Sequence, residues 1–157
     1  MLSDFQDSVI QYNIVPQVTA ITIKTNLTEA KYQFAKGIAQ FSMYLDHKLR
    51  CNCRLETTDT AKTTCINNYS DFDVKSSTTA CAVCKGAVQY LKALRTVDST
   101  MRCSDSMKDI CSPFNDGLHS VGLACRLSTK SLCGITLMEQ MVDSQSISEF
   151  CSGHSYC

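Results

Sequence analysis

The cysteines are the side chains whose reactivity and spacing indicate a chemical role. The 157-residue chain contains eleven, and Cys81 and Cys84 form a Cys-x-x-Cys pair. Such a pair can be a redox site, part of a zinc site with Cys51, Cys53 and Cys65, or two disulfide halves. A thioredoxin-like redox site needs a strand before it, and the Ser/Thr residues 76–79 do not resemble one. A zinc site needs a second close cysteine pair at ligand spacing, and none follows. We favour structural disulfides and expect no metal and no cofactor.

The histidines stand apart from any recognisable catalytic arrangement. His47, His119 and His154 are isolated, and a serine beside a histidine in sequence is not a triad, which is defined in space. The chain also has no Gly-rich phosphate loop, no paired-carboxylate motif and no Glu-x-x-His pattern. We therefore expect no catalytic residue and a protein that is not an enzyme.

Charge is balanced both overall and locally. Residues 1–77 hold eight basic and eight acidic side chains, and residues 78–157 hold seven of each. This balance gives no support for steering toward nucleic acid or a strongly anionic membrane. The only small basic cluster along the sequence is Lys48, Arg50 and Arg54, which is typical of a solvated helix end. We expect no nucleic-acid partner.

The cysteine content indicates a secreted or extracellular setting, with a lysosomal or vesicular one as the variant. Two sequons, at Asn26 and Asn68, agree with that setting and are predicted glycosylation sites. The first five residues lack the basic start and apolar stretch of a signal peptide, so we expect a mature chain. No run approaches the length that spans a bilayer.

The clearest helix of the first half runs from Asn26 to about Leu49. Asn26 can cap it, with Glu29 three residues on as in a capping box. This helix either packs on the rest of the protein or binds lipid or a partner through its apolar stripe. The stripe recurs every three or four residues: Ala30, Phe34, Ile38, Phe41, Leu45 and Leu49. Residues 2–23 are ambiguous.

Residues 50–80 are polar and are interpreted as a long connection pinned by cysteines. Cys51 and Cys53 are too close to bridge each other easily, so one of them is expected to bond Cys65. The other remains an odd thiol that could bond a protein partner or a second copy of the chain.

Helical periodicity returns from Cys81, with a second short helix ending at Cys111 and starting at Ser99 or Ser104. A third helix is predicted over about residues 118–142, and a last one opens at Ser146. No convincing strand series follows residue 25. The predicted fold is all-α, a disulfide-braced helical bundle. Residues 1–77 form a helical segment with a cysteine-containing linker, and residues 78–157 form the main domain.

The numbers of the C-terminal cysteines pair in a regular way. The residue numbers of Cys111 and Cys125 add up to the same total as those of Cys103 and Cys133. Residues that lie at one level of an antiparallel helical hairpin have such a constant total, because both helices rise by the same distance per residue. Cys84 with Cys151 and Cys81 with Cys157 nearly obey the same rule. Eight cysteines can pair in many ways, so this rule only gives a preference.

The order of six cysteines resembles that of saposin-like (saposin B-type) domains. They are Cys81 and Cys84, then Cys111, Cys125, Cys151 and Cys157, separated by 2, 26, 13, 25 and 5 residues. The resemblance implies bonds between first and sixth, second and fifth, and third and fourth cysteines, which are the pairs that the register favours. It covers about residues 78–157, leaves Cys103 and Cys133 as an extra pair, and assigns no family to the first half.

Saposin-like domains bind lipids, present them to hydrolases or perturb membranes, so the resemblance implies a secreted lipid-binding or membrane-interacting protein. The alternative is a secreted signalling or recognition protein that uses the bundle as a platform, with the N-terminal helix over the apolar groove. The same apolar residues would line a lipid-contacting inner face or fill a closed core. They are Val83, Val88, Leu91, Leu94, Leu132, Ile135, Met138 and Met141.

Overall fold

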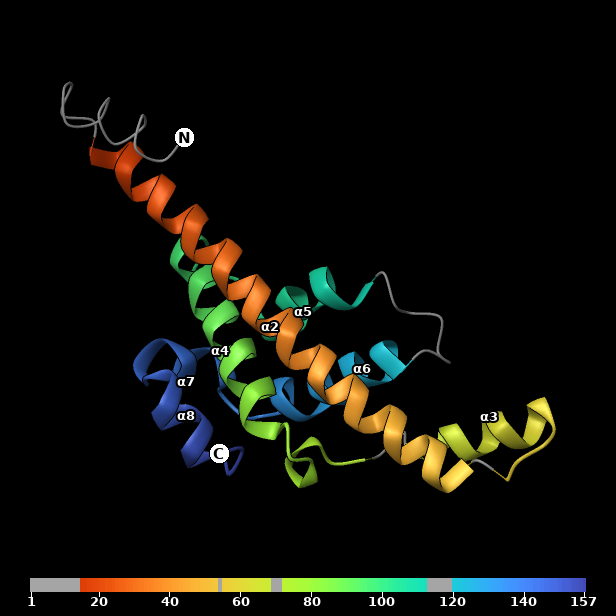
Figure 1. Cartoon of the computed structure of the whole chain (residues 1–157). Helices are drawn as coiled ribbons and strands as arrows, with labels where there is room; N and C mark the ends of the chain where they lie inside the picture. Colours follow the sequence, from red (N-terminus) through yellow and green to blue (C-terminus); the bar gives the residue numbers. More distant parts are fainter. Residues whose placement is uncertain (1–14, 54, 69–71, 113–119) are drawn as a thin grey trace.

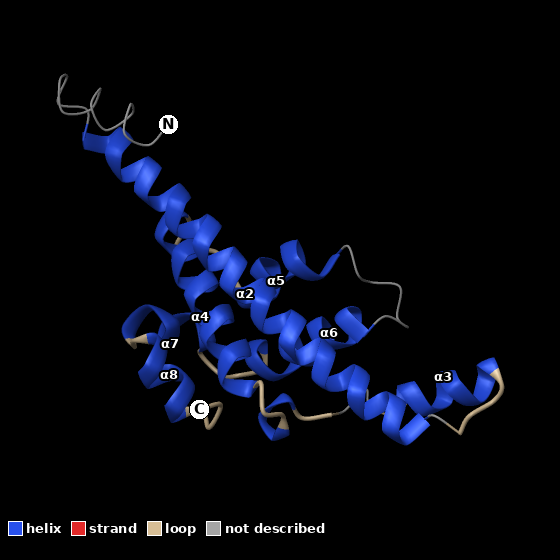
Figure 2. Cartoon of the chain, in the orientation of Figure 1, coloured by secondary structure: helices blue, strands red, loops and turns tan. Residues whose placement is uncertain are grey.

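The computed structural model describes residues 15–53, 55–68, 72–112 and 120–157. Within these ranges the chain forms seven α-helices and one short 3-10 helix, and no strand is present (Figure 2). Five disulfides brace the helices. The predicted all-α, disulfide-braced bundle is therefore confirmed.

Helix α2 (Val15–Cys53) is much longer than the predicted helix. The predicted start at Asn26 is wrong, because the helix runs through this residue, which is exposed. Glu29 does not act as the second half of a capping box; its Oε1 accepts a hydrogen bond from Gln33 Nε2 at 2.9 Å. A polar residue on the solvent side of a long helix costs little, so a capping residue type alone did not mark a helix end.

The region predicted as a long connection, residues 50–80, contains helix α3 (Asp59–Asn67) and a 3-10 turn η1 (Val74–Ser76). Thr58 Oγ1 accepts a hydrogen bond from the Ala61 amide at 3.1 Å, and Asp59 lies in the first turn. Both features stabilise a helix start. The helix was not predicted, because the segment is polar throughout and has no apolar periodicity. The Cys53–Cys65 disulfide joins α3 to α2.

Five helices follow, and α2 lies across two of them. Figure 1 shows α2 crossing α4 and α6, while α7 and α8 lie on the other side of α4. The last helix begins as predicted, because the Ser146 side chain accepts a hydrogen bond from the Glu149 amide. The bounds are α4 (Ala80–Val97), α5 (Cys103–Cys111), α6 (Ser120–Cys133), α7 (Met138–Ser144) and α8 (Ile147–Gly153).

The single helix predicted over residues 118–142 is wrong, because the chain breaks between α6 and α7. Leu137 has a φ of 59°, in the left-handed region that ends helices. At Gly134 an added Cβ would lie 2.8 Å from the Lys130 carbonyl oxygen, so this turn requires glycine. The break folds α7 back, and Met138 becomes buried.

The C-terminal disulfides join Cys81 to Cys157, Cys84 to Cys151, Cys103 to Cys133 and Cys111 to Cys125. Their Cα–Cα distances run from 4.5 to 5.9 Å, within the ordinary range. They are the same four pairs that the register favoured. We call residues 81–157, with these four bonds, the C-terminal frame.

One hydrophobic core includes both α2 and the C-terminal frame. Phe34, Ile38, Phe41 and Leu45 of α2 are buried in the same cluster as the apolar residues of α4, α6 and α8. All eight cysteines of the frame bond one another, and Cys53 of α2 bonds Cys65. Among the described residues, α2 is therefore held to the frame by packing and without a disulfide.

Candidate functional site

The apolar face of α4 has two adjacent sides. Val83, Gly86 and Tyr90 lie on one side, and Cys84, Val88 and Leu91 lie on the other, about 100° around the helix. The first side contacts α2 and the second contacts α7 and α8, as the partners described below show. The apolar face of α4 is therefore a wide surface that two different layers bury.

Helix α2 approaches the first side of α4 very closely. A Cβ added at Gly37 would lie 2.9 Å from the Ala82 carbonyl oxygen, and one added at Gly86 would lie 2.8 Å from the Phe34 Cα. The Phe34 and Tyr90 rings pack with centroids 6.0 Å apart. Two glycines thus let the backbones meet at a distance that any larger side chain would prevent.

Tyr90 also joins this interface to α5. Its hydroxyl donates a hydrogen bond to Asp109 Oδ2 at 3.2 Å. Burial, followed by the nearby Asp109 charge, raises the pKa of Tyr90 to about 12. The tyrosine is therefore a neutral hydrogen-bond donor at any physiological pH and serves as a structural contact.

The second side of α4 is tied to α7 and α8 by covalent and charged contacts. Cys84 bonds Cys151 of α8, and Arg95 makes a two-pronged salt bridge to Asp143 of α7 with both distances at 2.8 Å. The Arg95 hydrogen bond holds the pKa of Asp143 below its ordinary value. Lys92 donates to the Val142 carbonyl, so this side is anchored in several independent ways.

The eight predicted lipid-contacting residues lie in or against the core. Leu94, Ile135 and Met141 are partly buried and pack on it. The fully buried residues, at 1 % exposure or less, are Val83, Val88, Leu91, Leu132 and Met138. The structure thus represents a closed arrangement, in which these side chains contact protein.

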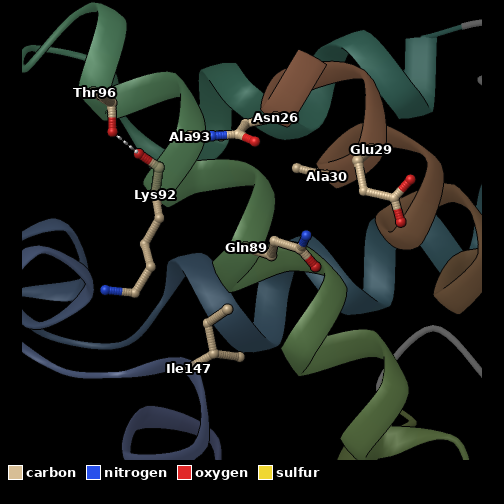
Figure 3. Close-up of a pocket in the computed structure, with 8 residues that line it drawn as sticks. All are labelled: Asn26, Glu29, Ala30, Gln89, Lys92, Ala93, Thr96 and Ile147. Atoms are coloured by element: carbon tan, nitrogen blue, oxygen red, sulfur yellow. Dashed lines mark hydrogen bonds between the residues drawn. The ribbon is translucent and has the colours of Figure 1, made fainter. Parts of the chain in front are cut away.

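A groove of about 310 Å³ lies where α2, α4 and α8 meet (Figure 3). Asn26 and Glu29 of α2 and Gln89 and Lys92 of α4 line it, together with Ile147 of α8. Asn26 and Asn68, the predicted glycosylation residues, are both exposed. A glycan on Asn26 would stand at the margin of this groove and restrict access to it.

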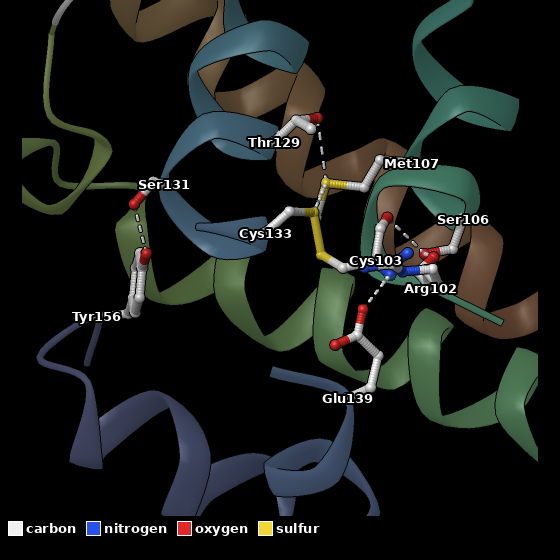
Figure 4. Close-up of a disulfide and its surroundings, with 9 residues drawn as sticks. All are labelled: Arg102, Cys103, Ser106, Met107, Thr129, Ser131, Cys133, Glu139 and Tyr156. Carbon is white, nitrogen blue, oxygen red and sulfur yellow. Dashed lines mark hydrogen bonds between the residues drawn. A yellow bond between two sulfur atoms is a disulfide. The ribbon is translucent and has the colours of Figure 1, made fainter. Parts of the chain in front are cut away.

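The α5–α6 hairpin is braced at both ends. Cys103–Cys133 and Cys111–Cys125 are eight residues apart on each helix, so they form two rungs of one antiparallel ladder. Figure 4 shows Met107 between the helices, where its Sδ accepts a hydrogen bond from Thr129 Oγ1 at 3.2 Å. Two disulfides therefore cross-link α5 to α6, one at each end of α5.

Helix α7 is fastened to the start of α5 by one carboxylate. Glu139 Oε1 accepts a hydrogen bond from the Cys103 amide at 3.0 Å (Figure 4). This bond lowers the pKa of Glu139 from its ordinary value. The Ser131 and Tyr156 hydroxyls also hydrogen-bond each other, which ties the C-terminal segment to α6.

Sequence analysis missed a basic cluster that the fold assembles. Lys108 of α5 with Arg126 and Lys130 of α6 line a groove on the hairpin. The available signal was the spacing of Arg126 and Lys130, which places two like charges one turn apart. Of the predicted basic cluster, Lys48 lies 5.6 Å from the Tyr44 ring centroid, and the Arg50 and Arg54 side chains lie outside the described residues.

The two histidines that the structure describes, His47 and His154, lie on different helices or helix ends. His154 packs against Phe150 at 4.5 Å between ring centroids, His47 is exposed on α2, and His119 lies outside the described residues. Within the described ranges, no three histidine, cysteine or acidic side chains gather as metal ligands. With ten cysteines in disulfides, Cys51 is the remaining one, and its side chain lies outside the described part.

No described helix has the length and apolar character to cross a membrane. The five disulfides fit an oxidising compartment, such as the extracellular space. Searches against protein-family models, curated proteins and solved structures found no match.

Proposed function

We propose that this chain is a secreted, non-enzymatic lipid-binding or membrane-interacting protein with a saposin-like C-terminal half. The observation that carries the proposal is the α2–α4 interface, which is apolar and has no disulfide across it among the described residues. Helix α2 can leave the C-terminal frame without any covalent bond breaking. The frame would then present the Val83 and Tyr90 side of α4 to a lipid phase.

The energy of the interface supports a closed resting state. Four large α2 side chains, Phe34, Ile38, Phe41 and Leu45, are at most 2 % exposed. Burying each is worth about 1.5–3 kcal/mol, which makes about 6–12 kcal/mol together. Water would not open the interface often, whereas lipid tails could replace the lost apolar contacts. Binding should therefore be slow and should require a fluid lipid phase.

Lipid binding is tested with the full-length oxidised chain. Co-sedimentation with phosphatidylcholine vesicles, at neutral and acid pH, and native mass spectrometry for bound lipid are the measurements. Phe41→Ala should weaken α2 packing and increase vesicle binding, while Met43→Ala, an exposed change on the same helix, should leave it unchanged. Absence of lipid under every condition would overturn the proposal.

The second candidate is a recognition platform in which α2 is permanently seated. The close backbone approaches at Gly37 and Gly86 favour it, because such fitted contacts are typical of a fixed helix pair. Cys51 would then serve as the covalent link to a partner or a second copy. Non-reducing gels of the wild type and Cys51→Ser test this link: a dimer band that only the wild type shows supports it, and a monomer in both removes it.

A further inference from the structure

The groove where α2, α4 and α8 meet lies between helix α2 and the C-terminal frame (Figure 3). Its volume of about 310 Å³ is within the range of about 300–1,000 Å³ that sites for small ligands have. Asn26 and Glu29 line it from α2, Gln89 and Ala93 line it from α4, and Ile147 lines it from α8. A group that fills this groove would therefore contact α2 and the frame at the same time.

The frame side of the groove offers both apolar surface and an amide to a ligand. Ala93 and Ile147 are only partly buried, so a ligand in the groove can contact their side chains. The Gln89 side-chain amide is also partly buried, and no described residue hydrogen-bonds it. This amide offers donors and an acceptor, and an acetamido group offers one of each in return. A ligand that carries both an apolar face and an acetamido group fits this surface.

Asn26 places a modification site directly at the groove. It begins the sequon Asn26-Leu27-Thr28, its side chain is exposed, and it is one of the lining residues. The first sugar of an N-linked glycan is N-acetylglucosamine, which is bonded to the asparagine side-chain nitrogen. This sugar has an acetamido group and an apolar ring face. It would therefore start at the groove with the chemistry that the frame side can bind.

We propose that Asn26 carries an N-linked glycan whose first N-acetylglucosamine occupies this groove and holds α2 on α4 and α8. The sugar is bonded to α2 and contacts the frame through Gln89, Ala93 and Ile147. Attachment forms a bond between Asn26 Nδ2 and the anomeric carbon of the sugar. The bond from that carbon to the diphosphate of a lipid-linked sugar donor breaks, the diphosphate leaves, and Nδ2 loses one proton.

The glycan acts where the described chain lacks a covalent link. No disulfide among the described residues joins α2 to the frame, so opening of α2 depends on noncovalent contacts. A directly attached sugar has an effective concentration of about millimolar or more, so even a weak contact should lower the population of opened α2 by about threefold or more. The contact itself can be measured without lipid; only its effect on vesicle binding rests on the proposed function.

The test uses the full oxidised chain, secreted from cells that attach high-mannose glycans. Peptide mass spectrometry shows whether Asn26 is modified, and hydrogen–deuterium exchange without lipid measures the amides of residues 26–37. Exchange should be about threefold faster in Asn26→Gln than in the glycosylated wild type. The matched controls are Thr28→Ser, which keeps this sequon, and Asn68→Gln, which removes the other one. Both should exchange as the wild type does.

An endoglycosidase that leaves a single N-acetylglucosamine separates the first sugar from the rest of the glycan. The trimmed wild type should keep the slow exchange, because the first sugar alone fills the groove, and this comparison needs no variant to fold. Gln89→Ala tests the frame side. It should speed exchange in the glycosylated chain and have little effect in the Asn26→Gln background, where there is no sugar contact to lose.

An unmodified Asn26 would overturn the proposal, as would equal exchange in wild type and Asn26→Gln, faster exchange after trimming, or equal effects of Gln89→Ala in both backgrounds. Vesicle co-sedimentation of the same samples separates this contact from the proposed function. Slow exchange that depends on the sugar, without any vesicle binding, would keep the glycan contact and remove the membrane role. Vesicle binding with equal exchange in all samples would do the reverse.

Discussion

The C-terminal frame and helix α2 are stabilised in different ways. Four disulfides hold residues 81–157, including one between Cys84 and Cys151 that is fully buried. Helix α2 contributes large apolar side chains to the same core, but its described disulfide joins Cys53 only to nearby Cys65. The frame keeps its topology when noncovalent contacts are lost, whereas α2 does not.

The stability of the C-terminal frame and the covering of its apolar face by α2 therefore depend on different interactions. Disulfides stabilise mainly by limiting the unfolded chain, so they protect the frame without deciding whether its apolar face is covered. Covering of the frame depends on noncovalent contacts of α2, which are its apolar packing and a hydrogen bond from Ser42 Oγ to Ser120 Oγ of α6 at 3.1 Å, and a lipid phase or a mutation can change them.

Reduction should produce the largest change. Each disulfide contributes about 2–4 kcal/mol, and four together exceed a common total stability of 5–15 kcal/mol or come close to it. Adding reductant should therefore unfold the frame, seen as lost helical circular dichroism and a lower melting temperature. The matched variant Cys53→Ala with Cys65→Ala should keep the frame folded without reductant. Unchanged dichroism and melting under reductant would contradict the covalent frame.

Phe34→Ala should loosen α2 without breaking the frame. Removing a fully buried phenylalanine costs about 3–5 kcal/mol of unfolding free energy. Denaturant unfolding should show this loss, while the disulfide map stays the same. Tyr32→Ala, on the exposed side of the same helix at 60 % exposure, is the control and should change stability by less than about 0.5 kcal/mol. Similar losses in both variants would mean that α2 is not packed as described.

Gly86→Ala tests the close approach of α2 and α4. The added methyl would meet the Phe34 Cα at 2.8 Å, and such overpacking costs about 1–3 kcal/mol. Gly153→Ala is the control, because nothing lies within 4 Å of its added Cβ. Thermal unfolding should show a loss only for Gly86→Ala. A stabilised Gly86→Ala protein would show that the helices are farther apart.

Acid should weaken the attachment of α7 to α4 and α5, with a smaller loss of stability than the core mutations cause. The pKa values of Glu139 and Asp143 are lowered in the folded chain, by the Cys103 amide and by the Arg95 hydrogen bond. Their stabilisation is complete above the ordinary values of 4.5 and 3.8 and is lost as pH falls through the lowered folded values. Melting temperature should therefore fall below about pH 4.5, and Glu139→Gln with Asp143→Asn should flatten this part of the profile. An unchanged profile in the variant would assign acid sensitivity to other groups.

Local patterns predicted the frame well. The Cys-to-Cys spacing and the nearly constant total of the paired residue numbers favoured the four bonds, because residues at one level of antiparallel helices have a constant total. Ser146 and Glu149 marked the last helix start by their chemistry. The break between α6 and α7 had one sequence signal, Gly134 directly after the last residue of α6, which the apolar periodicity across it outweighed; a leucine in the left-handed region, as at Leu137, has no such signal.

The candidate sites were harder to predict than the fold. Periodicity identified the apolar side of α4 but could not tell which other helices would cover it. Val83 and Val88 were therefore predicted as lipid contacts, and the structure buries both against other helices. The basic groove joins Lys108 to Arg126 and Lys130 across a hairpin, and its residues are not one cluster along the chain. The α2–α4 contact at Gly37 and Gly86 depends on tertiary approach, which single-chain spacing does not encode.

Hydrogen–deuterium exchange with and without vesicles tests whether α2 leaves α4 when lipid binds, because it reports the amides of α2 and of the frame separately. Backbone amides of residues 26–49 should exchange faster when phosphatidylcholine vesicles are bound, as α2 leaves α4. Amides of α4 and α8, held by the Cys84–Cys151 bond, should keep their protection. Unchanged α2 protection on bound vesicles, or a loss shared equally by α2 and the frame, would contradict the account.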